Sequence, residues 1–474
     1  MTLLLVQLSP IALVIILILL LRFPPVKAAL AGVLLVIFLW FFDMASPVTF
    51  ASTEVIVKDT LVMFMSTAGV IIPGLAFVIL VERQRVPQAI GHWVNELGWT
   101  PPAQVLFIIL GLAPLLEAMT GFGVSLIATV PLLMGLFNRQ SGMKIALSGM
   151  VIMPWGTLGL ATLIGALLAH LPPNTLGSHS ALVSTPVFIC LTGIALWLAG
   201  IRTLLPWLAL LIISGIFIGV LFSVNLYSGP EVSGVLAGLS ITVVGLAIAF
   251  MRRGKWAHWP KAAWPYLALL GVVVLSRIIF TLTGWDSSWV LTGAHVSWKP
   301  LASPGGALIL VSLFMVLKQK GFAGFPWKAL YYRGKFSVAT IFLFLLLSQI
   351  MVNGGFLAST QNLLHTLSGV SLAPVLAVLS GLAGYVTGSN VGGNTLIMPS
   401  VSALSDGHGV WLAAIVNSAA GHGALGSLSI LSLITGLAAA SRQEEHSLIR
   451  FAFGLVFLNT LIVAVTGVVI FSVL

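Results

Sequence analysis

The stretch GYVTGSNVGGNTLIMP, residues 384–399, lies between apolar runs and decides how the whole chain is interpreted. It gathers two asparagines, three Ser/Thr hydroxyls and four glycines. Non-helical backbone is tolerated at membrane depth only where it is buried in protein or lines a wet cavity. The stretch therefore predicts a deliberate break in a membrane segment.

The composition places the chain in a membrane. Of its 474 residues, 59% are hydrophobic and only 7% are charged, whereas soluble domains carry about a quarter charged residues. Apolar runs of spanning length recur from end to end, which predicts an all-α polytopic membrane protein with the lipid bilayer as its surroundings. The net charge of +10 comes from Lys and Arg scattered in short loops, so we expect no nucleic-acid partner. The sequence has no cluster of His or carboxylates at ligand spacing, which argues against an enzyme and against a bound cofactor.

Breaks between apolar runs define the elements. Twelve spanning helices are predicted, at 3–22, 27–42, 60–81, 145–170, 184–201, 204–223, 231–251, 264–284, 305–317, 336–352, 411–439 and 449–472. Two further apolar segments, 103–136 and 370–403, are interrupted by glycine-rich polar motifs and are predicted to be re-entrant hairpins. Each follows a shorter segment, 86–99 or 356–369, whose polar residues recur at helical spacing, as in an interfacial helix.

The chain repeats itself at an offset of 267 residues. Thr120-Gly121 maps onto Thr387-Gly388, and GTLG at 156–159 maps onto GALG at 423–426. Several elements in the same order indicate an internal repeat. The predicted parts are repeat 1 at 1–203 (hairpin 103–136, broken helix 145–170), a two-helix connector at 204–262, and repeat 2 at 263–474 (hairpin 370–403, broken helix 411–439).

The basic residues predict the orientation. If both hairpins return to their starting side, 18 Lys and Arg fall on one side and only Lys58, Arg277 and Lys299 on the other. The positive-inside rule then puts both termini outside a cell membrane, and we expect a bacterial inner membrane. The two repeats are inverted in this arrangement, which is typical of secondary transporters. Arg277 is expected to snorkel to the outer interface, and a solvated outer loop is expected to hold Asp43, Glu54, Lys58 and Asp59.

The interruptions in the hairpins and in the broken helices predict a site near the membrane midplane. Half-helix N-termini carry positive partial charge and free N–H donors, which suit a carboxylate. The predicted substrate-binding residues are Thr120, Gly121, Gly123, Ser125, Thr387, Gly388, Ser389, Asn390, Gly393, Asn394, Thr395, Asn417 and His422. The alternative for the small residues is close packing of helices, and His422 could equally be a structural hydrogen-bond donor.

Glu117 is the only carboxylate well inside an apolar stretch. An acid at membrane depth is costly, which makes it a functional candidate. Low dielectric favours the protonated carboxyl, so Glu117 could carry a coupling proton. The alternative is a structural glutamic acid bonded to nearby backbone.

Two motifs resemble the L-lactate permease family. LLEAMTGFG (115–123) looks like that family's Leu-Glu-Gly-Ala-Ala-Gly-Phe-Gly, and GYVTGSNVGGNTL (384–396) looks like its Phe-Leu-Thr-Gly-Ser-Asp-Thr-Ser-Ser-Asn-Ala-Leu. The resemblance implies an elevator of the ion-transporter superfamily that takes up short 2-hydroxy monocarboxylates with protons, with Glu117 as the coupling group. Two departures bear on the substrate: Asn390 replaces an acid, and HGALGSLS (422–429) lacks the family's lysine.

The sequence is therefore compatible with three functions. The leading one is proton-coupled symport of a small organic anion such as lactate or glycolate. The second is a sodium-coupled carboxylate transporter of the same architecture, because SNVGGNT (389–395) resembles sodium-coupled dicarboxylate carriers. The third is a channel, against which the inverted repeat argues. Related carriers are commonly homodimers, so a homodimer is compatible with the resemblance, but no residue of this sequence specifies a dimer face.

Overall fold

A computed structural model describes residues 2–21, 23–121, 123–254, 258–319, 321, 324–359, 362, 369–401 and 409–474. The first half contains α1 (Thr2–Leu19), α2 (Pro25–Phe41), α3 (Phe50–Arg83), α4 (Val86–Glu96), α5 (Pro101–Phe107), the π-helical η1 (Ile108–Leu112), α6 (Ala113–Thr120), α7 (Val124–Leu136), α8 (Arg139–Ser148), the 3-10 turn η2 (Met153–Trp155), α9 (Gly156–Ala169), α10 (Pro173–Leu198), α11 (Leu204–Ser228) and α12 (Pro230–Arg253).

The second half contains one short antiparallel ribbon and the remaining helices. Its elements are η3 (Lys261–Ala263), α13 (Trp264–Thr283), η4 (Trp285–Ser288), β1 (Leu291–Thr292), β2 (Ser297–Trp298), α14 (Pro304–Gln319), α15 (Trp327–Asn353), α17 (Gly369–Thr387), α18 (Asn390–Ile397), η6 (Met398–Ser400), α19 (Gly409–Ala424), α20 (Leu428–Ala438) and α21 (Arg442–Val473). In the ribbon, Leu291 pairs with Trp298 and Thr292 with Ser297.

The described residues include ten helices that are long and apolar enough to cross a membrane, or eleven if the bent pair Arg139–Ser148 and Met153–Ala169 counts as one span. The chain is therefore an all-α polytopic membrane protein. Two of the ten, Pro101–Thr120 and Gly369–Thr387, are the first arms of the predicted hairpins. The twelve predicted spans all fall on helices, but α1, α2 and α14 are shorter apolar helices, so the count of twelve stays a prediction.

Of the four residues expected in a charged outer loop, Asp43 lies in an exposed turn, whereas Glu54, Lys58 and Asp59 lie in helix α3. Thr49 caps α3 by accepting a hydrogen bond from the Ser52 N–H, so this helix begins at Phe50 rather than near residue 60. Glu54 and Lys58 form an exposed i,i+4 ion pair, as a solvated face would. The prediction is wrong for Asp59, whose side chain is only 1% exposed.

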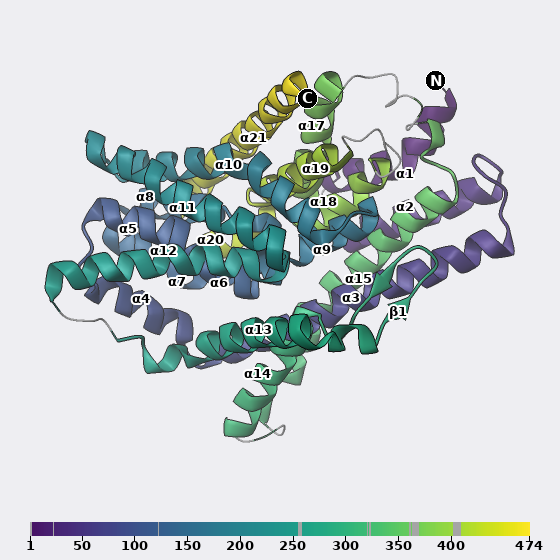
Figure 1. Ribbon diagram of the computed structural model, residues 1–474. Helices are drawn as coiled ribbons and strands as arrows, with labels where there is room; N and C mark the ends of the chain where they lie inside the picture. Colours follow the sequence, from purple (N-terminus) through teal and green to yellow (C-terminus); the bar gives the residue numbers. More distant parts are fainter. Residues whose placement is uncertain are drawn as a thin grey trace.

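The helices fall into two groups that pack mainly within themselves (Figure 1). The scaffold group consists of α1, α2, α3, α13, α14 and α15. The hairpin group consists of α4 to α12 and α17 to α21, including the two connector helices α11 and α12. Contacts between the groups run chiefly through α3 with α9, α15 with α18 and α1 with α17. The scaffold group comes from residues 2–83 and 264–353, two segments that the offset of 267 residues nearly superimposes.

Two ion pairs near helix ends join elements that the basic residues assign to one side. Arg333 near the start of α15 pairs with Glu82 at the end of α3 at 2.7 Å, and Arg139 at the start of α8 pairs with Glu444 at the start of α21 at 2.8 Å. The internal repeat, its inversion and the outward position of both termini stay predictions. The predicted interfacial helix 86–99 coincides with α4, whereas most of 356–369 lies outside the described residues.

Candidate functional site

The first hairpin turns at Gly121 and Gly123, which both have positive φ (67° and 73°). Glu117 lies one turn before this tip and reaches across it. Its Oε1 accepts the Gly123 N–H at 3.0 Å, and its Oε2 accepts the Ser125 hydroxyl at 2.7 Å and the Ser125 N–H at 3.4 Å. The carboxyl group therefore caps the start of α7, where N–H groups lack partners within the helix. Thr120 turns its hydroxyl back to the Leu116 carbonyl at 2.6 Å.

The tip of the first hairpin packs against the break in the first broken helix. Thr157, Leu158 and Gly159 have left-handed φ of 53°, 56° and 70°, so the chain between η2 and α9 is not a regular helix. A Cβ at Gly121 would overlap the Thr157 hydroxyl. Trp155, at the same break, donates its indole N–H to Asn225 Oδ1 at 3.1 Å, which ties the break to connector helix α11.

Gly121→Ala should disrupt this tip. Gly121 has φ 67° and ψ −161°, a backbone conformation that only glycine adopts readily. Alanine there costs about 1–3 kcal/mol before the overlap with Thr157 is counted. The expected results are a lower unfolding temperature in detergent and weakened substrate binding. Gly135→Ala is the matched control, because that glycine lies in α7 with nothing within 4 Å of an added Cβ, and alanine there should stabilise by about 0.5–1 kcal/mol. Equal stability of the two variants would remove any special role for the tip.

The second hairpin turns at Gly388, with φ of 67°, and is capped by Ser389. The Ser389 hydroxyl accepts the Gly392 N–H at 3.4 Å, and the Thr395 hydroxyl donates to the Gly392 carbonyl at 2.8 Å. Thr387 returns its hydroxyl to the Ala383 carbonyl at 2.8 Å. A Cβ at Gly388 would approach Ser429 in the first turn of α20, and Ser427 in the break between α19 and α20. Each hairpin tip thus packs against the broken helix that follows it in the chain.

Asn417 of α19 is the centre of a buried polar network. Its Oδ1 accepts hydrogen bonds from the side-chain amides of Asn394 at 2.9 Å and Asn390 at 3.3 Å. Its Nδ2 donates to the hydroxyls of Thr162 and Ser180, both at 3.0 Å. All four hydrogen-bonding positions of the Asn417 amide are used. We call these five residues the Asn417 network; it joins α18, α19, α9 and α10.

Helix α9 connects the two hairpins. Thr157 meets the first tip, and about one helical turn further on the Ala161 carbonyl accepts a hydrogen bond from Asn394 Nδ2 at 2.9 Å. Each hairpin also contacts the broken helix of the other predicted repeat. A Cβ at Gly123 of the first hairpin would lie against Ile430 and Leu433 of α20, while α18 of the second hairpin packs on α9. Both predicted clusters therefore belong to one packed body.

Three buried groups in this body are incompletely satisfied within the described part of the chain. Asn390 Oδ1 and Asn394 Oδ1 have no hydrogen-bond partner there, and the same holds for both ring nitrogens of His422. His422 packs edge-on against Phe188, with ring centroids 5.8 Å apart. No described hydrogen bond joins the His422 ring to the Asn417 network, so the structure does not bring this predicted ligand to the others.

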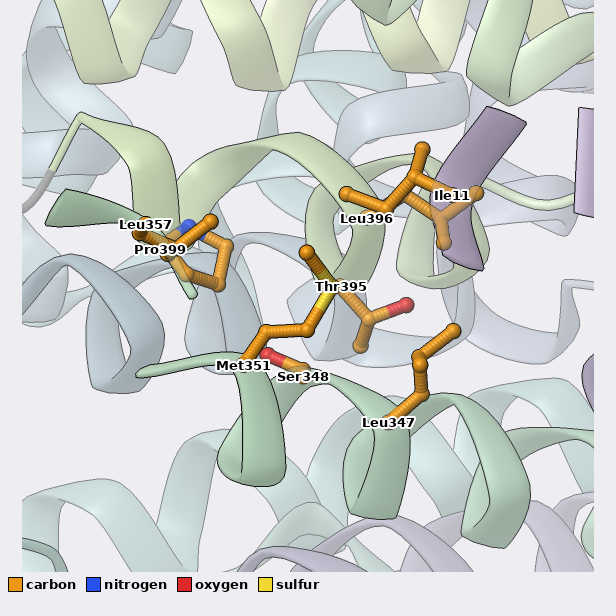
Figure 2. Close-up of a pocket in the computed structure, with 8 residues that line it drawn as sticks. All are labelled: Ile11, Leu347, Ser348, Met351, Leu357, Thr395, Leu396 and Pro399. Carbon is orange, nitrogen blue, oxygen red and sulfur yellow. The ribbon is translucent and has the colours of Figure 1, made fainter. Parts of the chain in front are cut away.

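A small cavity lies between the second hairpin and the scaffold group, beside the contact of α18 with α15 (Figure 2). Thr395, Leu396 and Pro399 line one wall, and residues from α1, α15 and the following turn, Ile11, Leu347, Ser348, Met351 and Leu357, line the others. The lining is aliphatic with two hydroxyl groups and carries no charged side chain. It is an apolar seam between the two groups rather than a carboxylate pocket.

Sequence reasoning missed Thr162 and Ser180. Both hydroxyls are fully buried, and both accept hydrogen bonds from Asn417. Thr162 follows the break at 156–159 by only a few residues, which was the available signal. Ser180 lies in an ordinary helical stretch, and its sequence surroundings carry no comparable signal.

No protein-family model matches the chain, and no curated protein matches it.

Proposed function

We propose that the chain is a secondary active transporter for a small organic anion, a proton-coupled symporter of a short 2-hydroxy monocarboxylate such as lactate or glycolate. The observation that carries the proposal is the Asn417 network, which joins a hairpin to both broken helices deep in the protein. Broken helices that meet near the midplane are where secondary transporters hold their substrates. The resemblance of 115–123 and 384–396 to L-lactate permeases supports the substrate class.

An elevator motion is part of the proposal. The scaffold group comes from the first part of each predicted repeat, and the hairpin group contains both hairpins and both broken helices. Few contacts join the groups, and an apolar cavity lies in the seam between them. Such a seam allows one rigid body to slide past another. The substrate would travel with the hairpin group.

Glu117 is the proposed coupling residue. Its carboxyl group accepts hydrogen bonds from the N–H groups of Gly123 and Ser125 and from the Ser125 hydroxyl. A proton added to the carboxyl group converts one of these acceptor positions into a donor. Protonation is in this way coupled to the conformation of the hairpin. The anion itself would be held by backbone N–H groups at half-helix ends and by the amides of Asn390 and Asn394, without a lysine.

Replacing Asn390 or Asn394 by alanine should weaken anion binding by about tenfold, as expected for the loss of one buried hydrogen-bonding group. Affinity is measured by the ligand-dependent rise in unfolding temperature of the purified protein. Ser380→Ala is the control, because Ser380 is a fully buried hydroxyl on α17 that has no hydrogen-bond partner in the described structure. Wild-type affinity in both asparagine variants would return the motif to a packing role.

Sodium coupling is the second candidate. The unpartnered oxygens of Asn390 and Asn394 are neutral ligands of the kind that hold Na⁺ at broken helices. With sodium as the coupling ion, Glu117 would keep only its capping role. A bacterial inner-membrane location with both termini outside is part of either version, and a homodimer is compatible with both.

The experiment is uptake of labelled lactate, glycolate and a dicarboxylate into proteoliposomes. A proton gradient and a sodium gradient are imposed separately. The proposal predicts accumulation of the monocarboxylates under the proton gradient alone. Sodium-dependent accumulation would indicate that sodium and not the proton is the coupling ion. Equilibration without accumulation would indicate a channel.

A further inference from the structure

Among the described residues, two contacts between titratable or charged side chains cross from the scaffold group to the hairpin group. In the first, Arg277 Nη1 of α13 lies 3.8 Å from Glu231 Oε1 of α12. The arginine side chain is 33% exposed and the glutamate 15%. Arg277 was expected only to snorkel to the interface, and the structure instead gives it a specific partner in the other group.

The second contact runs through the β-ribbon. Asp59 of α3 fixes the turn between β1 and β2, because its Oδ1 accepts the N–H groups of Ala294 at 2.6 Å and His295 at 3.1 Å. Its Oδ2 lies 3.1 Å from His295 Nδ1. The His295 ring in turn faces His170 at the end of α9, with ring centroids 6.5 Å apart. The rings of His295 and His170 thus connect the scaffold group to the C-terminal end of α9.

The two contacts lie on the same edge of the hairpin group. Asn174 follows His170 by four residues, and its Nδ2 donates to the Leu226 carbonyl at 3.3 Å near the end of α11. Asn174 Oδ1 also lies near Gly229, which directly precedes α12 and Glu231. A movement of the hairpin group past the scaffold would have to break both contacts together.

We propose that the pairs Arg277–Glu231 and His295–His170 form a clasp that holds the hairpin group against the scaffold group and that acid on this side releases it. The inference rests on the proposed function, since a clasp matters only if the groups move. With His170 uncharged, its ring can stay in contact with the ring of His295. A proton on His170 is opposed by its burial and by His295 across the contact, whereas Asp59 favours the charge.

The charged and titratable groups facing His170 are His295 and Asp59. Burial and the neighbouring His295 lower the pKa of His170 below its ordinary value, while Asp59 opposes the shift. A histidine whose pKa is depressed in the clasped form binds a proton more readily once released. The clasp is therefore intact above the ordinary histidine pKa of about 6.5 and loosens as the pH falls below that value.

The test measures separation of the two groups without substrate. Ser348→Cys is placed in a Cys190→Ala background, which removes the single native cysteine. Ser348 lines the cavity in the seam and is 4% exposed, so its thiol should react when the groups part. Modification by a membrane-permeant maleimide is followed at pH 7.5 and pH 5.5. Each rate is divided by that of a reference cysteine at exposed Gln443, which cancels the effect of pH on thiol chemistry.

We expect the normalised rate to rise about fivefold at pH 5.5, the scale of one weak electrostatic contact. His170→Gln should abolish the pH effect. Glu231→Gln should raise the normalised rate at both pH values. The swapped double variant Glu231→Arg with Arg277→Glu should return the rate to that of the unswapped protein. Recovery in the swap separates loss of the clasp from misfolding.

Equal rates in all variants, or a pH effect that survives His170→Gln, would overturn the clasp. Failure of the proposed function would look different. In that case the labelling would still respond to pH and to Glu231→Gln, while proteoliposomes accumulated no carboxylate.

Discussion

Asn417→Ala should abolish transport and lower the free energy of unfolding by about 4 kcal/mol or more. The side chain is fully buried and makes four hydrogen bonds. Its removal leaves the Asn390 Nδ2 and the Ser180 hydroxyl without a described partner, while Asn394 keeps its bond to Ala161 and Thr162 its bond to Pro154. Each unsatisfied buried polar group costs about 1–3 kcal/mol. Denaturant unfolding in detergent and uptake into proteoliposomes would both record the change.

The control for Asn417 is again Ser380→Ala. Both residues are fully buried polar positions within the hairpin group, but Ser380 has no hydrogen-bond partner among the described residues. We expect Ser380→Ala to alter stability by less than about 1 kcal/mol. If the two variants unfolded alike, the network would be incidental to the fold, and the function argued from it would lose its main support.

Glu117→Gln should abolish proton-driven accumulation, a fall of at least about tenfold, while leaving substrate exchange measurable. Glutamine keeps a carbonyl acceptor for the tip but cannot release a proton. Glu117→Ala should be worse, because all three hydrogen bonds to Gly123 and Ser125 are lost. Uptake with and without a proton gradient distinguishes loss of coupling from loss of the tip.

Ser125→Ala is the matched variant for Glu117. It removes the hydroxyl donor at 2.7 Å but keeps both backbone N–H groups and the carboxyl group. We expect weaker binding with intact proton coupling. Unchanged pH-driven accumulation in Glu117→Gln would take this residue out of the mechanism and leave it as a helix cap.

Much of the fold was predictable because the relevant signals are local. Apolar runs and their Gly, Pro and charged interruptions placed a helix on every predicted span. Gly121 and Gly388 were expected at the interruptions of two apolar segments, and both adopt there a positive φ that glycine tolerates at low cost. The start of α3 was missed because its cap, Thr49 with Ser52, precedes a polar stretch that resembles a loop.

The site was predictable only in part because its partners are distant in the chain. Asn417 bonds to Ser180 across 237 positions and to Thr162 across 255. Pattern reasoning found Asn390, Asn394 and Asn417 because they accompany breaks in apolar segments. A serine inside a regular helix gives no such signal. The partners of Asp59 and Arg277 were missed for the same reason, since only the packing of α3, α12 and α13 brings them together.

In the proposed mechanism, the hairpin group carries the anion past the scaffold group as one body. Spin labels in the Cys190→Ala background measure it directly. One pair, Lys58→Cys with Gln443→Cys, spans the two groups, and the other, Tyr227→Cys with Gln443→Cys, lies within the hairpin group. On adding lactate at acid pH, the first distance should change by more than about 5 Å while the second stays constant. Constant distances in both pairs, or a change confined to the second pair, would contradict movement of the hairpin group as one body past the scaffold group.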